Sequence, residues 1–151
     1  MQKIVPFLWF NGQAEEAMNL YVATFPNSKA GTVTRQGDQV FSVEFELDGV
    51  SFYGLNGGPM YSFTPAISMF VRCQTQDEVD TLWHKLLAGG GVENRCGWLQ
   101  DRFGLSWQIV PVQLTTLLRD PDPVKAGRVM QAMMGMVKLD IAALQQAHAG
   151  A

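Results

Sequence analysis

The alternation of apolar and polar residues predicts short strands, and apolar residues at helical spacing predict helices between them. VFSVEFEL (40–47) alternates over eight positions, which is typical of a strand with one face in water. LDGVSF places Asp-Gly between two such runs, which predicts a hairpin. For the first half of the chain we predict a helix near 13–24 and strands near 3–10, 29–36, 39–47 and 50–56.

The same order of elements returns in the second half. AEEAMNLY (14–21) aligns with QDEVDTLW (76–83) at an offset of 62 residues, and GVSF (49–52) aligns with GLSW (104–107) at an offset of 55. The second helix is predicted near 75–88, where AGGG ends it. The strands of this half are predicted near 65–72, 92–97, 98–102 and 105–111.

The end of the chain is helical in pattern. Asp122 before Pro123 predicts the start of one helix, and Asp140 predicts the start of a second. Four methionines give the first of these helices an apolar side, which we expect to pack on the sheet or on a partner subunit rather than to form a lid. The fold class is therefore α+β, with two βαβββ modules at 1–60 and 61–112 and a helical extension at 113–151, in one structural domain overall.

Composition excludes several classes of function. Apolar residues make up 47% of the chain and charged residues 17%, which is typical of a globular protein. A net charge of −3 without basic clusters argues against a nucleic-acid or anionic-membrane partner. No apolar run is long enough for a membrane helix, and the first residues fit a strand better than a signal peptide. With only Cys73 and Cys96, we expect free thiols and a cytoplasmic location.

Six stretches of the chain are distinctive: PFLWFNGQAEEAMNLY, FPNSK, FELDG, LNGGP, CGWLQDRFGLSWQIVP and DPDPVKAGRVMQAM. They resemble the PhnB-like branch of the vicinal oxygen chelate superfamily, which contains glyoxalases, extradiol dioxygenases and antibiotic-binding resistance proteins. Members of this branch have often been labelled 3-demethylubiquinone 3-methyltransferases. The resemblance implies paired modules that form a cupped eight-stranded mixed sheet around a pocket, and a homodimer.

The resemblance also implies where a metal would bind. Metal-using members take one ligand from the first and last strand of each module, and in GLSWQ the residue at the carboxylate position is Gln108. The 55-residue offset places Tyr53 at the equivalent position of the first module. Stretches 4–10 and 66–71 contain no His, Asp, Glu or Cys. Because amides and hydroxyls are poor ligands for transition metals, we expect neither a metal site nor a cofactor.

Alternation indicates which side chains would line a pocket in place of the metal. Family spacing favours Leu8 and Phe10 on the first strand, although the opposite parity, with Phe7 and Trp9 inside, stays open. These side chains could also simply fill the core, and Asn56 could serve a turn. The predicted pocket-lining residues are Leu8, Phe10, Tyr53, Leu55, Asn56, Ser68, Phe70, Arg72, Trp98, Ser106 and Gln108.

Two functions fit this pattern. The first is binding of a small hydrophobic or aromatic molecule in a largely apolar pocket. The second is an enzyme of the superfamily that acts on a small aromatic or quinone-like substrate, which includes the methyltransferase label. A typical site for a methyl donor needs a glycine-rich turn between a strand and a helix in a parallel sheet, and neither the chain length nor the strand order offers that fold. LNGGP is not followed by a predicted helix, so it is not a phosphate loop either. Asp101 and Arg102 could clamp a substrate, but a solvated pair in a hairpin is the simpler interpretation.

Overall fold

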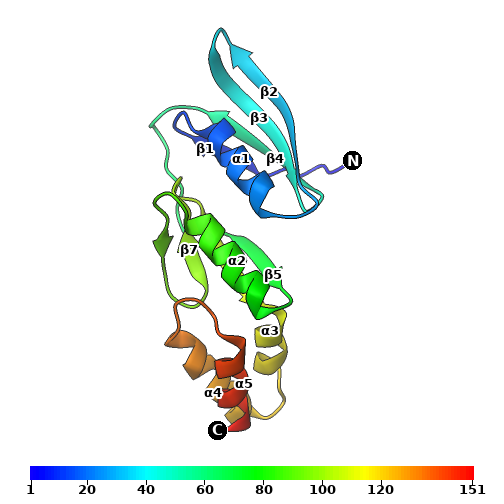
Figure 1. Ribbon diagram of the computed structural model, residues 1–151, viewed down its shortest axis with the longest axis vertical. Coiled ribbons are helices and arrows are strands. Elements are labelled where there is room, and N and C mark those ends of the chain that lie inside the picture. Colours follow the sequence, from blue (N-terminus) through cyan, green and yellow to red (C-terminus); the bar gives the residue numbers. More distant parts are fainter. The chain divides into compact units, whose positions relative to one another are not determined.

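The computed structural model describes all residues from 1 to 151, and the chain divides into two compact units, Met1–Thr64 and Pro65–Ala151 (Figure 1). Each unit contains one βαβββ module, which confirms the α+β class and the repeat. The eight strands are divided between two four-stranded mixed sheets. No helix has the length and apolar character needed to span a membrane.

The first unit has the strand order β1-β4-β3-β2, with β1 parallel to β4 and the other neighbours antiparallel. Three strands have the predicted bounds, whereas β1 is shorter than predicted and begins at Phe7. Its elements are β1 (Phe7–Phe10), α1 (Ala14–Thr24), β2 (Lys29–Gln36), β3 (Gln39–Leu47) and β4 (Val50–Asn56).

Helix α1 covers one face of this sheet and leaves the other face open. Tyr21 of α1 is fully buried, and its ring lies 6.2 Å from the ring of Phe45 on β3. Gly54 of β4 belongs to the covered face, because a Cβ there would lie 2.8 Å from Val43 Cγ2 and 3.6 Å from Ala14 Cβ. The glycine therefore lets α1 approach the sheet closely, and its neighbour Tyr53 faces the opposite way.

The second unit repeats this arrangement with the strand order β5-β8-β7-β6. Strands β6 and β7 are much shorter than predicted, because Cys96 and Gly97 between them have φ angles of 59° and 84° and turn the chain. Trp83 and Leu86 of α2 are buried with Trp107 and other residues of the sheet. The elements are β5 (Met69–Cys73), α2 (Gln76–Leu87), β6 (Val92–Glu93), β7 (Trp98–Gln100) and β8 (Ser106–Pro111).

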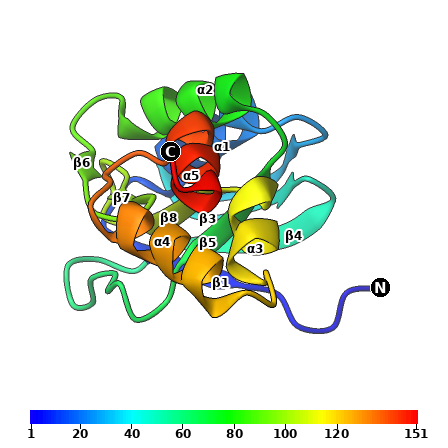
Figure 2. The same cartoon turned by 90° about the horizontal axis from the view of Figure 1, so that it is seen from below.

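The chain ends in three helices rather than the predicted two, and they pack against one another (Figure 2). They are α3 (Val112–Leu118), α4 (Pro123–Met134) and α5 (Ile141–Ala149). Both predicted caps are confirmed, because the Asp122 carboxylate accepts from Val124 N and that of Asp140 accepts from Ala143 N. Helix α3 was not predicted, because it follows β8 directly and has no capping side chain to mark its start.

This extension is anchored to its module by backbone and side-chain hydrogen bonds. The amides of Cys96 and Gly97 donate to the carbonyls of Met136 and Val137, both at 2.8 Å. The amide side chain of Gln76, at the start of α2, bonds the backbone on both sides of Asp140. The apolar core of the extension is formed by Val110, Leu114, Val129, Leu139 and Leu144.

Candidate functional site

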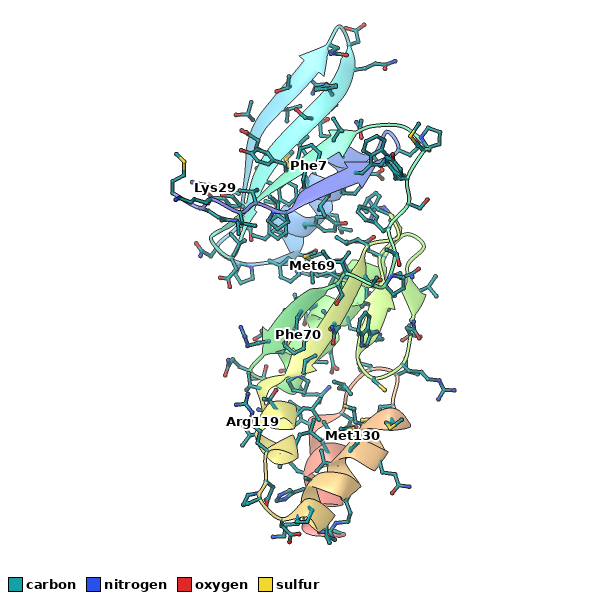
Figure 3. The ribbon with its side chains drawn as sticks, turned by 180° about the vertical axis from the view of Figure 1, so that it is seen from behind. Phe7, Lys29, Met69, Phe70, Arg119 and Met130 are labelled. Atoms are coloured by element: carbon teal, nitrogen blue, oxygen red, sulfur yellow. The ribbon has the colours of Figure 1, made fainter.

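The open face of the first sheet carries a row of three side chains on neighbouring strands. Phe7 on β1 is the register partner of Tyr53 on β4, and Tyr53 is the partner of Glu44 on β3. Directly opposite residues share a face, so the three side chains lie side by side. The two rings are 6.1 Å apart, and Phe7 and Tyr53 are 59% and 39% exposed. Figure 3 views the strands of this unit from the side away from α1, with Phe7 labelled.

A cavity of about 320 Å³ lies over this row. Its volume is within the range of small-molecule sites. Its wall combines two aromatic rings, three hydroxyl side chains and one carboxylate. The lining residues are Phe7, Thr32, Thr34, Ser42, Glu44 and Tyr53.

Three of the residues predicted to line a pocket on this module lie elsewhere. Leu8 and Phe10 are buried on the side of α1, because the pairing of Leu8 with Gly54 fixes the parity of β1. Asn56 is engaged by the backbone, since its Oδ1 accepts from Ala14 N and its Nδ2 donates to Val40 O. It therefore fastens the first turn of α1 to the sheet, and Phe7 takes the place beside Tyr53 that the prediction gave to Leu8 and Phe10.

A larger cavity of about 700 Å³ lies on the other side of this unit. It is bounded by the start of α1, the β2–β3 hairpin and the end of β4. Glu15 on its wall is paired with Arg35 at 3.1 Å, and Asn56 is saturated by the backbone. Glu15 and Asn56 are thus used by the fold rather than left for a ligand.

The second unit places three of its predicted residues, Phe70, Trp98 and Gln108, side by side on the open face of its own sheet. Gln108 on β8 is the register partner of both Phe70 on β5 and Trp98 on β7. Its Nε2 donates to Ser68 Oγ at 2.9 Å. Phe70 is 51% exposed and is labelled on β5 in Figure 3. Arg72 is also exposed and follows Phe70 two residues along the same strand face.

Ser106 belongs to the same parity of β8 as Gln108 but is differently placed. It is 1% exposed, and its Oγ has no hydrogen-bond partner. Val110, the next residue of this parity, is buried in the core of the helical extension. The extension therefore occupies the end of this strand face, whereas Phe70 stays exposed and Trp98 and Gln108 are half-buried.

The residues at the superfamily's metal positions do not fit a transition metal. Tyr53 and Gln108 offer a phenol and an amide, and the structure has no group of three or more His, Cys, Asp or Glu side chains that could hold a metal ion. Imidazole, thiolate or carboxylate donors are needed for such a site. His148 instead pairs with Asp120 at 2.7 Å between two parts of the extension.

Asp101 has neither of the two roles considered for it. It is 3% exposed, so it is not a solvated hairpin residue, and its carboxylate is used by the β7–β8 turn. Oδ1 accepts from Phe103 N at 2.9 Å and Leu105 N at 3.1 Å, and Oδ2 accepts from the Trp107 indole at 2.9 Å. Arg102 lies over the ring of Phe103 instead.

The thiols offer no nucleophile on the open faces. Burial, and then the neighbouring Glu78, raise the pKa of Cys73 to about 12, which keeps this thiol protonated and unreactive. Cys73 lies among buried residues of the second sheet. Cys96 is half-buried in the turn that contacts the extension.

Comparisons with known proteins identify the family. Residues 2–110 match the family described as 3-demethylubiquinone-9 3-methyltransferase. The chain belongs to this family. Its PhnB-like members are part of the vicinal oxygen chelate superfamily, as the stretches quoted from the sequence predicted. The match ends at residue 110, so helices α3, α4 and α5 lie outside it.

Solved structures agree with this assignment. A PhnB protein from Bacillus cereus, described as a 3-demethylubiquinone-9 3-methyltransferase, is 35% identical over 73% of this chain and 99% of its own, with a TM-score of 0.68. A protein from Pseudomonas aeruginosa shares the fold at 19% identity, covering 74% of this chain and 98% of its own, with a TM-score of 0.63.

A fosfomycin resistance protein from Listeria monocytogenes, solved with Mn(II) and sulfate, shares the fold at 12% identity. The match covers 71% of this chain and 88% of the resistance protein, with a TM-score of 0.50. No match was found among curated proteins.

The sequence analysis missed Glu44 and its hydroxyl neighbours as site residues. The signal was present, because Ser42 and Glu44 occupy the polar positions of the alternating run 40–47. What the pattern alone could not supply was the pairing of β1 with β4, which brings Phe7 beside Tyr53.

Proposed function

We propose that the protein binds a small, largely apolar or aromatic molecule at the open faces of its sheets, without a transition metal. The observation that carries this proposal is the cavity of about 320 Å³ beside the exposed rings of Phe7 and Tyr53. Exposed aromatic side chains are costly unless something covers them, and a few polar groups beside them orient a ligand. The second sheet offers a similar set, with Phe70 and Trp98 beside Gln108.

The competing function is catalysis on an aromatic or quinone-like substrate, which the description of the family favours. Methyl transfer would need a site for the methyl donor. The glycine-rich stretch 55–59 follows β4, and the next regular element is strand β5 rather than a helix. The stretch therefore lacks the helix N-terminus that a glycine-rich turn uses to hold a nucleotide or phosphate. Binding without methyl transfer is the simpler function for these residues.

We further propose that the protein acts as a homodimer in the cytoplasm. Met130 and Met134 lie one turn apart on α4 and are 44% and 60% exposed, which suits burial against a second copy. The two cysteines are unpaired, as is usual in a reducing compartment. Light scattering at micromolar concentration should give twice the chain mass, and a monomer would contradict the dimer.

Binding can be tested with 2-naphthylmethanol, a neutral aromatic probe whose fluorescence anisotropy reports binding directly. The wild-type protein should bind it, and Tyr53→Ala should weaken binding about tenfold, because one aromatic contact contributes about 1 kcal/mol or more. Phe41→Ala is the matched control, since Phe41 is 42% exposed in the same unit but does not line this cavity. Equal losses in the two variants, or no binding at all, would contradict the proposal.

Two further measurements separate the alternatives. A thermal-shift titration with zinc or nickel should leave the melting temperature unchanged at stoichiometric metal, whereas a rise of several degrees would show a metal site. Calorimetry with S-adenosylmethionine should show no heat of binding. Saturable binding of this donor would favour the enzyme.

A further inference from the structure

The cavity of the first unit contains a carboxylate that restricts which aromatic molecules can bind. Resting on the proposed function, we infer that Glu44 makes this cavity selective for an aromatic ring that bears a positively charged amino group on a short arm. The inference concerns the chemical class of the ligand. It rests on the position of Glu44, on its lack of a partner and on the rings next to it.

Glu44 lies in line with the two rings of the open face. Glu44 is in register with Tyr53, which is in register with Phe7, so the carboxylate continues the line of the two rings across three strands. Neighbouring strands are about 4.8 Å apart. A planar molecule resting on Phe7 and Tyr53 therefore brings a substituent one or two bonds beyond its ring to the carboxylate.

Charge comes next. The side chain of Glu44 makes no hydrogen bond and no ion pair, although its hydroxyl neighbours Thr34 and Ser42 line the same cavity. Glu46, two residues further along the same strand face, is paired with Lys29 at 3.7 Å. The charge of Glu46 is therefore neutralised within the protein, whereas the carboxylate of Glu44 is available to pair with a ligand.

The neighbouring rings favour the same ligand. A cation held at Glu44 lies next to Tyr53, whose π-electrons attract it in addition to the carboxylate. An anion would be repelled by Glu44, and a neutral alcohol would gain only a hydrogen bond. A metal ion is not favoured here, because hydroxyl side chains are the only additional donors within the lining.

Three probes of equal shape test the inference: 2-naphthylmethylamine, 2-naphthylmethanol and 2-naphthoate. At low salt the amine should bind about tenfold more tightly than the alcohol, because its ammonium group gains a charge pair with Glu44 and a cation–π contact with Tyr53 together. The naphthoate should bind most weakly. The preference for the amine should shrink between 20 mM and 500 mM salt, because salt screens exposed charges.

Variants of the two glutamates provide the control. Glu44→Gln should reduce binding of the amine about tenfold and change binding of the alcohol less than twofold, whereas Glu46→Gln should change neither. Glu44→Lys should reverse the preference in favour of 2-naphthoate, and circular dichroism checks that each variant is folded.

The outcomes separate the inference from the proposed function. If the alcohol binds and Glu44→Gln leaves the preference for the amine unchanged, the inference is wrong and binding of aromatic molecules stands. If the amine and the alcohol bind equally to the wild type, the inference is likewise wrong. If none of the three probes binds, both fail.

Discussion

The buried carboxylate of Asp101 provides the sharpest test of how the second module is held together. It accepts two backbone amides of the β7–β8 turn and the indole N–H of Trp107, in a site that is 3% exposed. Asp101→Ala would leave these three donors without an acceptor. Hydrogen bonds to a charged group contribute about 1.5–3 kcal/mol each, and water entering the turn recovers part of this.

We therefore expect Asp101→Ala to lower the free energy of unfolding by about 3–5 kcal/mol. Asp101→Asn should cost less, about 1–3 kcal/mol, because its single oxygen can still serve the backbone amides. The NH₂ group of the asparagine, however, would then face the N–H of Trp107, and two donors cannot form a hydrogen bond with each other. Urea unfolding followed by tryptophan fluorescence measures both losses, and Asp38→Asn in the exposed β2–β3 turn serves as the control.

A double-mutant cycle with Trp107→Phe tests the cause. Phenylalanine has no N–H, so Asp101→Asn should cost clearly less in the Phe variant than in the wild type. Equal costs in the two backgrounds would show that the indole is not the reason for the loss. A loss below about 1 kcal/mol for Asp101→Ala would refute the whole account of this turn.

Three further predictions concern other parts of the second unit. A thiol reagent at pH 8 should modify Cys96 but not Cys73 in the folded protein, and both after denaturation; modification of both in the folded state would contradict the raised pKa of Cys73. The Asp122 amide, and then His148, lower the pKa of Asp120, so its contribution to stability is present above pH about 4 and is lost as the pH falls through the lowered pKa. Melting temperatures should therefore fall less between pH 4 and 2 in Asp120→Asn than in the wild type. Parallel curves of melting temperature against pH would contradict a stabilising role of the ionised Asp120. Gly97→Ala should destabilise the protein by about 2 kcal/mol or more, because φ is +84° and the new Cβ would lie 2.8 Å from Leu139 Cδ1. An unchanged urea midpoint would show that the helical extension can shift without loss of stability.

Much of the fold could be read from the sequence because it depends on near neighbours. The alternation of 40–47 and the Asp-Gly turn gave β3 and β4 their bounds. Asp122 and Asp140 cap their helices as predicted, because a cap needs only a side chain and an amide two or three residues later. Helix α3 was missed, since it begins directly at the end of β8 without a cap or a breaker.

The candidate site was only partly predictable. On β8 the sequence placed Gln108 correctly relative to Ser106, but the burial of Ser106 and Val110 depends on what covers them. On β1 the sequence left two parities open. Its pairing with β4, nearly fifty residues away, puts Phe7 rather than Leu8 on the side of Tyr53.

The sequence by itself determined the repeat, the order of elements within the two modules and the lack of metal-binding side chains at the superfamily's positions, because these are properties of residue types and their spacing. Only the tertiary structure decided which carboxylate lies beside the rings of the open face. Glu44 and Glu46 have the same parity and similar neighbours in the chain. One is paired with Lys29 and the other is not, and that difference arises from the register of β3 with β2.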